Sequence, residues 1–332
     1  MTNKNFNYAI EEVYSLLGKL PNDVDDIDER SPIVLYLCAL FAELAYYLIP
    51  KWEIDNDKRA KLIPCDRYKE ILRTRTPTDS MEFINIFLDL PGFVVVDRGV
   101  VAVGIVMDHL LFIGFRGTQF LYDWKINIRS RLIPIAYPRD QKFIFAPDFF
   151  LSQLSGRLHS GFAEEALRIS IRIQNAILDL KPQVDINRIF LSGHSLGGAV
   201  AAISSNLLLR FASASVCIFG APRYSDLSSY FSHSYFFGHP FRTLQVRRSG
   251  DVVPTIPPKI FGYADHPYVF DTNGEQFSDP FPYLTPIFGE FLRWSQFLLG
   301  GFNPHKIEEY RREIGESAGA VAAGLPLAPI KK

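Results

Sequence analysis

The first half of the chain contains three apolar, β-branched and aromatic runs that predict neighbouring strands. They cover residues 93–96, 100–107 and 110–115, and only Asp97-Arg98-Gly99 and Asp108-His109 separate them. Connections this short join antiparallel strands, because parallel strands need a long crossover. The pattern therefore predicts an antiparallel meander that leads into a sheet.

The second half alternates between helix-like and strand-like periodicity. Apolar residues at helical spacing predict a helix from Phe162 to Leu180, which Lys181-Pro182 ends. Further on, short apolar runs at 186–191, 215–219 and 243–246 predict strands, and the Ala- and Leu-rich residues 199–209 predict a helix between the first two. This alternation predicts an α/β fold with a mostly parallel central sheet flanked by helices.

Residues 33–49 are apolar except for Glu43, and Pro32 and Pro50 bracket them. The run allows two interpretations, a short membrane span or a buried helix. About 17 residues is the lower limit for crossing a bilayer, so we favour a buried core helix over residues 32–49.

The sequence contains no obvious linker that would split its central part into two domains. Residues 1–31 are polar, end in an acidic run, and predict a solvated N-terminal extension. Residues 32–312 predict a single domain, with a long irregular, lid-like insertion around 119–158. Residues 313–332, rich in Ala, Gly and Pro, predict a disordered tail.

Composition narrows the function class. Apolar residues make up 48% of the 332 residues and charged residues 21%, which is sufficient for a large core. A net charge of −1 argues against a nucleic-acid partner. Three cysteines among apolar neighbours and no secretory signal predict a cytoplasmic or peripherally membrane-associated protein. No metal site or cofactor is implied, and the oligomeric state stays open.

One stretch carries a chemical signature. Gly193-His194-Ser195-Leu196-Gly197 lies between a predicted strand and a predicted helix, the context of a nucleophile elbow. In that turn a strained serine projects its hydroxyl out of the fold, and the next helix directs its N-terminus toward it. Ser195 is therefore the candidate nucleophile.

A serine nucleophile needs a base and an acid that orients it. Asp251 follows a predicted strand and is favoured over Asp226, which lies in a connecting segment. His266 and His305 are the histidines after Asp251, and position alone does not decide between them. The connection after Asp251 contains three prolines, so the run at 268–270 is expected to be antiparallel, which would bring His266 near the active edge.

The order of six blocks resembles the class 3 (fungal-type, triacylglycerol) lipase family, over residues 33–312. The resemblance implies an α/β-hydrolase fold. The matching blocks are Phe115-Arg116-Gly117-Thr118 with Asp123-Trp124, His159-Ser160-Gly161-Phe162, residues 193–198, residues 219–223, residues 251–258, and a late segment holding His305 and Tyr310.

By this resemblance Ser195 is the nucleophile, His305 the base and Asp251 its orienting acid. The resemblance also assigns the oxyanion hole to the backbone N–H groups of Leu196 and Thr118. His159 and Arg116 match family blocks and are interpreted as structural. The family's lid suggests candidate substrate or lid residues, namely Phe120, Leu121, Tyr122 and Trp124, with Phe288 and Trp294 in a second aromatic stretch. For these aromatics, contact with a lipid surface and packing over the acyl groove both stay open.

The sequence thus predicts a serine ester hydrolase of lipase type that cleaves medium- to long-chain acyl esters through an acyl-enzyme. A phospholipase A-type enzyme or a short-chain carboxylesterase with the same triad is the nearer alternative. A lipase-like interaction protein without turnover is the more distant one. The expected partner is a lipid or acyl-ester substrate, with peripheral contact to lipid surfaces.

Overall fold

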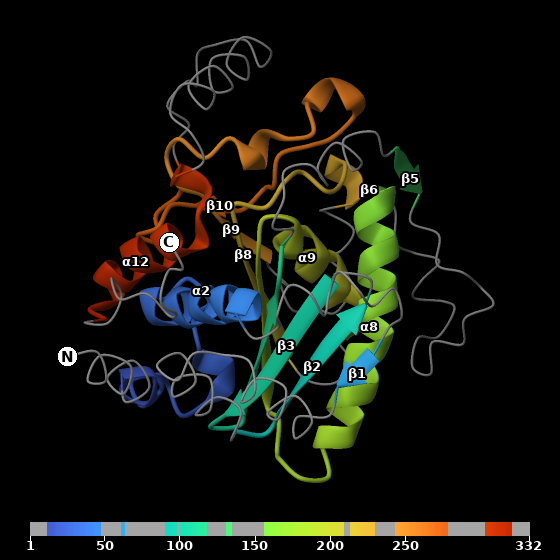
Figure 1. The fold of residues 1–332 in the computed structure, drawn as a ribbon. Helices are drawn as coiled ribbons and strands as arrows, with labels where there is room; N and C mark the ends of the chain where they lie inside the picture. The colour runs from blue at the N-terminus through green and yellow to red at the C-terminus, as the bar shows by residue number, and fades with distance from the viewer. Residues whose placement is uncertain are drawn as a thin grey trace.

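The computed structural model describes nine stretches of the chain. These are residues 12–47, 61–63, 90–97, 100–117, 131–134, 156–208, 213–229, 243–277 and 303–320. They form one central sheet covered by helices on both faces (Figure 1).

The sheet has eight strands in the order β1-β2-β3-β4-β7-β8-β9-β10. The first four pair antiparallel, and from β4 onward every pair is parallel. Their bounds are β1 (Lys61–Ile63), β2 (Gly92–Asp97), β3 (Val100–Met107), β4 (Leu110–Phe115), β7 (Arg188–His194), β8 (Ser213–Phe219), β9 (Thr243–Val246) and β10 (Val269–Phe270). The predicted meander and the mostly parallel sheet of an α/β-hydrolase fold are confirmed.

Helices cover both faces of the sheet (Figure 1). α2 (Pro32–Tyr47) and α12 (Ile307–Ala318) lie on one face, while α8 (Ser160–Leu180) and α9 (Leu196–Leu208) lie on the other. Each side has its own cluster of buried apolar residues. β5 (Leu132–Pro134) and β6 (Arg157–His159) form a separate antiparallel ribbon. β5 lies within the predicted insertion, and β6 ends at the residue before α8.

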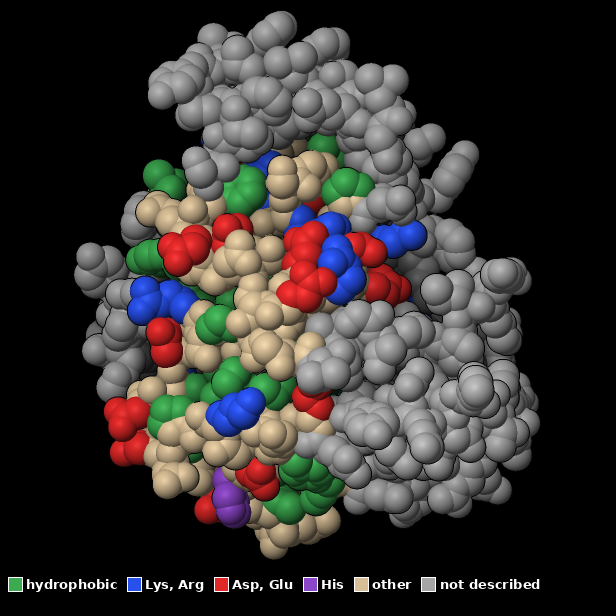
Figure 2. Space-filling model, turned by 90° about the vertical axis from the view of Figure 1, so that its left-hand side faces the viewer, with side chains coloured by type: hydrophobic (Ala, Val, Ile, Leu, Met, Phe, Trp, Pro, Cys, Tyr) green, Lys and Arg blue, Asp and Glu red, His purple; other side chains and the backbone are tan. Residues whose placement is uncertain are grey.

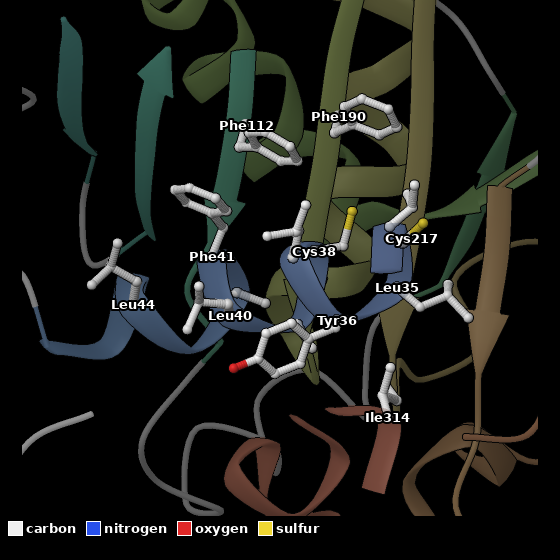
Figure 3. Close-up of a cluster of buried hydrophobic side chains, with 14 of the residues drawn as sticks. Leu35, Tyr36, Cys38, Leu40, Phe41, Leu44, Phe112, Phe190, Cys217 and Ile314 are labelled. Atoms are coloured by element: carbon white, nitrogen blue, oxygen red, sulfur yellow. The ribbon is translucent and has the colours of Figure 1, made fainter. Parts of the chain in front are cut away.

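The helices differ in character because they are covered differently. α8 is amphipathic, and buried His159 caps it by accepting the backbone N–H of Phe162. α2 is buried along residues 34–45 because the sheet covers one side and α12 the other. Phe41 stacks on Phe112 of the sheet at 4.7 Å between ring centroids, while Tyr36 faces α12 (Figure 3). The buried-helix interpretation is confirmed. Within the described residues, no helix has both the length and the apolar character needed to cross a bilayer.

Residues 12–31 are solvated only in part, so the prediction of a solvated extension is wrong for the side chains that pack in the core. These are Val13, Leu16 and Leu17, at helical spacing, and Ile27; most residues from 21 to 30 are exposed. Arg188 of β7 also donates to the carbonyl oxygens of Val24 and Ile27 and pairs with Glu29. One arginine thus holds the backbone of the acidic segment against the sheet, while most of its carboxylates stay exposed.

Two further expectations need correction. α12 runs to Ala318, and Ile314 and Ala320 are buried, so residues 313–320 are not a disordered tail; residues 321–332 lie outside the described part. β10 pairs with β9 in parallel, not antiparallel. The residues between them make the crossover with two 3-10 turns, η2 (Val253–Thr255) and η3 (Lys259–Phe261), without an α-helix.

A buried ion pair joins α12 to α2. The Arg311 guanidinium lies 2.5 Å from Glu43, and both side chains are at most 2% exposed. Burial raises the pKa of Glu43 to about 7, although Arg311 acts in the opposite direction. Figure 2 faces the side where α12 lies and shows basic and acidic side chains grouped on the surface. Arg312, next to Arg311 in sequence, has a side chain that is 39% exposed and pairs with Glu309 and Glu316.

We expect Arg311→Met to lower the free energy of unfolding by about 3 kcal/mol at pH 8, because Glu43 is left buried without its cation. In the native variant Glu43 stays protonated, whereas the unfolded chain ionises it above its ordinary pKa of 4.5. In the wild-type protein Glu43 becomes protonated as the pH falls through about 7, so the loss should be smaller at pH 5 than at pH 8. Urea unfolding at pH 8 and pH 5 measures this. Arg312→Met is the matched control and should change stability by about 0.5 kcal/mol or less at both pH values. Equal losses for the two variants would contradict the assignment.

Candidate functional site

Ser195 occupies a sharp turn between β7 and α9. Its φ is +57°, the left-handed region that a serine adopts only under constraint. The flanking glycines explain the tightness: a Cβ on Gly193 would lie 2.4 Å from the Gly197 carbonyl oxygen, and one on Gly197 would lie 2.4 Å from that of Phe115. The predicted strand–turn–helix context of Ser195 is confirmed.

The end of β4 lies beside this turn. A Cβ on Gly117 would be 3.2 Å from that of Ser195, so the two segments are in contact. Leu196 begins α9, where backbone N–H groups have no helical acceptor. Its N–H therefore belongs to the positive end of the helix next to the serine. Thr118, the other predicted oxyanion residue, lies outside the described residues.

Asp251 follows β9 and is fully buried at its carboxylate. Tyr310 donates its hydroxyl to Oδ2 at 2.6 Å, and the backbone N–H of Val253 donates to Oδ1 at 2.9 Å. Burial by itself raises the pKa of Asp251, but the adjacent His305 and these hydrogen bonds outweigh it and hold the pKa below its usual value. Asp251 is therefore an anion with both oxygens engaged.

His305 lies at the end of the 3-10 turn η4 (Asn303–His305), just before α12. Its Nδ1 is 2.9 Å from Oδ2 of Asp251 and 3.1 Å from Oδ1. Because a carboxylate only accepts, Nδ1 carries the proton, and Nε2 is the nitrogen able to take one up. The structure therefore brings together Asp251 and His305 in the arrangement that orients a general base.

The competing candidates lie elsewhere. Asp226 pairs with Arg157 at 3.0 Å and caps the backbone N–H of Ser229. His266 is buried and receives the backbone N–H of Tyr268, and burial lowers its pKa to about 4. The parallel orientation of β10 removes the reason for placing His266 at the active edge.

Two residues of the site were not identified from sequence. Gly220, with φ +54°, passes so close to the acid–base pair that a Cβ there would be 2.5 Å from Asp251 Oδ2 and 3.1 Å from His305 Nδ1. Arg223 donates to the carbonyl oxygens of Thr255 and Pro257, which fixes the segment after Asp251. Both residues belong to the block at residues 219–223. The sequence therefore marked them as part of a family motif but did not indicate what either residue does.

The predicted lid and substrate residues Phe120, Leu121, Tyr122, Trp124, Phe288 and Trp294 lie outside the described residues. In the described part of the chain, His, Cys, Asp and Glu side chains form no group of three arranged to hold a metal ion.

Comparison with known proteins finds a family similar to part of this chain. The sequence model described as "Lipase (class 3)" matches residues 112–261. Over these residues the chain is similar to the class 3 lipase family. The matched residues therefore include the end of β4, the Ser195 turn and the Asp251 segment, and they end before His305.

The chain is also similar to the lipase of Rhizomucor miehei, with 26% identity over 163 residues. This match covers 47% of the chain and 40% of that lipase, so the chain matches about two fifths of the relative's length.

Solved lipase structures are similar as well. The Lip2 lipase of Yarrowia lipolytica has 18% identity and a TM-score of 0.47, covering 73% of this chain and 80% of that one. The mono- and diacylglycerol lipase of Aspergillus oryzae has 15% identity and a TM-score of 0.48, covering 71% and 77%.

A substitution at Gly220 tests whether the acid–base geometry matters for serine reactivity. We expect Gly220→Ala to slow labelling of Ser195 by a fluorophosphonate at least about tenfold, because its methyl group displaces Asp251 or His305. The labelling rate is measured by mass spectrometry of the intact chain.

Gly250→Ala is the matched control, since Gly250 also has positive φ (+80°) but a Cβ there would come no closer than 3.5 Å to Pro304. Both alanine variants place a side chain at positive φ, but only the Gly220→Ala methyl group intrudes on Asp251 and His305. Equal labelling of the two would show that the intrusion is unimportant.

Proposed function

We propose that the chain is a serine ester hydrolase of lipase type that cleaves medium- to long-chain acyl esters, such as acylglycerols, through an acyl-enzyme. The observation that carries the proposal is the hydrogen-bonded Asp251–His305 pair in a fold whose β7–α9 turn holds Ser195 in strained backbone. The match of residues 112–261 to the class 3 lipase family model supports the same chemistry.

In the proposed first step, Nε2 of His305 takes the proton of the Ser195 hydroxyl as the oxygen attacks the ester carbonyl. Asp251 keeps the imidazole in the tautomer with Nδ1 protonated and stabilises the positive charge that His305 acquires. The leaving alcohol takes its proton from His305. Water then attacks the acyl-enzyme, with His305 again as the base.

The negative charge that develops on the carbonyl oxygen needs donors fixed in advance. The N–H of Leu196 at the start of α9 is proposed as one and that of Thr118 as the other. Together they form the proposed oxyanion hole. The removal of one such donor lowers kcat by about a hundred- to a thousandfold in enzymes of this type.

A phospholipase A-type enzyme or a short-chain carboxylesterase would use the same three residues with a different acyl groove. These alternatives differ from the main proposal in substrate and not in chemistry. An interaction protein without turnover would need neither the Asp251–His305 pair nor a serine in strained backbone, so both features disfavour it.

Hydrolysis of p-nitrophenyl esters from acetate to palmitate tests the proposal. We expect turnover that favours the longer chains and falls at least about a thousandfold in Ser195→Ala, because the nucleophile is lost. A preference for acetate or butyrate would indicate a short-chain esterase. Folded wild-type protein without turnover on any ester would overturn the proposal and favour the interaction protein.

The assignment of the base has its own test. His305→Ala should lower kcat at least about a thousandfold, whereas His266→Ala, which removes the other histidine that follows Asp251, should retain most of the turnover. Circular dichroism checks that both variants are folded. The reverse ranking would assign the base to His266, and full activity in both would refute the triad.

A further inference from the structure

The residue before the proposed nucleophile has a buried side chain with two polar contacts. His194 ends β7 and is only 5% exposed. Its Nδ1 lies 2.9 Å from the hydroxyl of Tyr46, at the end of α2. Its Nε2 lies 2.6 Å from the backbone carbonyl oxygen of His305.

These partners define the state of the ring. A carbonyl oxygen only accepts, so Nε2 of His194 carries the hydrogen and donates it to His305. Nδ1 of a neutral ring then accepts, and the Tyr46 hydroxyl donates to it. Burial, reinforced by the nearby His305, lowers the pKa of His194 to about 3, so the ring is neutral at ordinary pH. Burial also raises the pKa of Tyr46, which keeps its phenol protonated as a donor.

The contacts continue to the end of β4. The backbone of Gly117 forms a hydrogen bond with the Tyr46 hydroxyl, and Gly117 itself is packed against Ser195. A chain of hydrogen bonds therefore runs from Gly117 through Tyr46 and His194 to His305. It links three segments around the serine: the end of β4, the end of β7, and η4.

This chain fixes His305 at a second point. Asp251 holds the ring at Nδ1, and His194 holds the backbone of the same residue at its carbonyl oxygen. The two imidazole rings lie 4.5 Å apart between centroids. A ring held at Nδ1 alone could pivot about that contact, whereas fixing the backbone as well determines where Nε2 points.

We propose that His194 and Tyr46 are positioning residues that hold the backbone of His305 so that its Nε2 faces the Ser195 hydroxyl. The inference rests on the proposed function, in which His305 is the base. It deepens that function by adding a support that contacts neither the substrate nor the reacting atoms.

The effect should fall on kcat and not on KM, because the two side chains orient the base without binding the ester. We expect Tyr46→Phe, which removes one hydroxyl, to lower kcat about tenfold, the loss typical of one buried neutral hydrogen bond. KM should change less than about twofold.

Tyr36→Phe is the matched control. Tyr36 is another buried tyrosine of α2, but its hydroxyl interacts with Arg311, away from Ser195. Its kcat should stay within about twofold of wild type. If Tyr46→Phe and Tyr36→Phe have the same kcat, the positioning role is wrong.

Substitutions at His194 separate the hydrogen bond from packing. His194→Gln keeps an N–H donor able to reach the His305 carbonyl, whereas His194→Leu keeps bulk and removes the donor. We expect His194→Leu to lose about a hundredfold in kcat and His194→Gln to recover at least about tenfold of that. Equal losses in two folded variants would mean that the donor has no role.

A measurement without turnover tests the network directly. In protein labelled with ¹⁵N-histidine, His194 should give the spectrum of a neutral ring protonated at Nε2 from pH 5 to pH 8, and Tyr46→Phe should shift its Nδ1 resonance. A ring that titrates in this range, or an Nδ1 resonance that Tyr46→Phe leaves unchanged, would overturn the inference. Failure of the proposed function is distinguishable, because it appears as absent turnover in the wild-type protein.

Discussion

The structure depends on one close approach, that of α9 to the strands at the Ser195 turn. With only hydrogen at positions 193 and 197, β7 can turn directly into α9 while the helix backbone meets the end of β4. The cost is a serine with φ +57°, strain that persists only where the surroundings enforce it. The interleaved packing of β4, β7 and α9 supplies that enforcement. It also leaves the Leu196 N–H and the helix dipole next to the serine.

α2 connects this turn to the rest of the molecule. Three of its residues face three different environments: Phe41 packs on the sheet, Glu43 pairs with α12, and Tyr46 reaches the site (Figure 3 shows the first). A helix that is apolar on all sides is expected only where it is covered on all sides. The few polar atoms that α2 does bury therefore need partners, and those partners lie on α12 and beside Ser195.

The sequence predicted most of the fold because the local patterns agree with the tertiary structure. The meander at residues 93–115 and the helix ending at Leu180 are where periodicity indicated. Predictions were wrong where a single long-range contact outweighs local composition. Arg188 ties the backbone of an acidic segment to the sheet, and a crossover of 3-10 turns leads to a parallel β10. Neither contact has a periodic signature.

The site was predictable only in part for a related reason. The elbow is local, so Ser195 and its context could be read from a few residues. The acid–base pair is not local: Asp251 and His305 are 54 residues apart, and the residues that surround them come from α2, β7, η4 and α12. Tyr46 looks ordinary in the sequence, since a tyrosine in an apolar helix predicts only packing. His194 and Gly220 lie in recognised blocks, but the blocks gave neither residue a role. Their roles come from the partners that the fold provides.

The position of α12 explains how the Asp251–His305 pair is held together. Its neighbouring residues Tyr310 and Arg311 point to different partners, because successive helical residues are about 100° apart. Tyr310 donates to Asp251, and Arg311 pairs with Glu43 of α2. Arg248, three residues before Asp251, adds a third attachment through Glu313 at 2.6 Å. The same helix that follows His305 is thus anchored to α2 and to the Asp251 loop, so the distance between acid and base is set by helix docking and not by either loop alone. A rigid scaffold on both sides of a hydrogen-bonded pair is what a proton-transfer site requires.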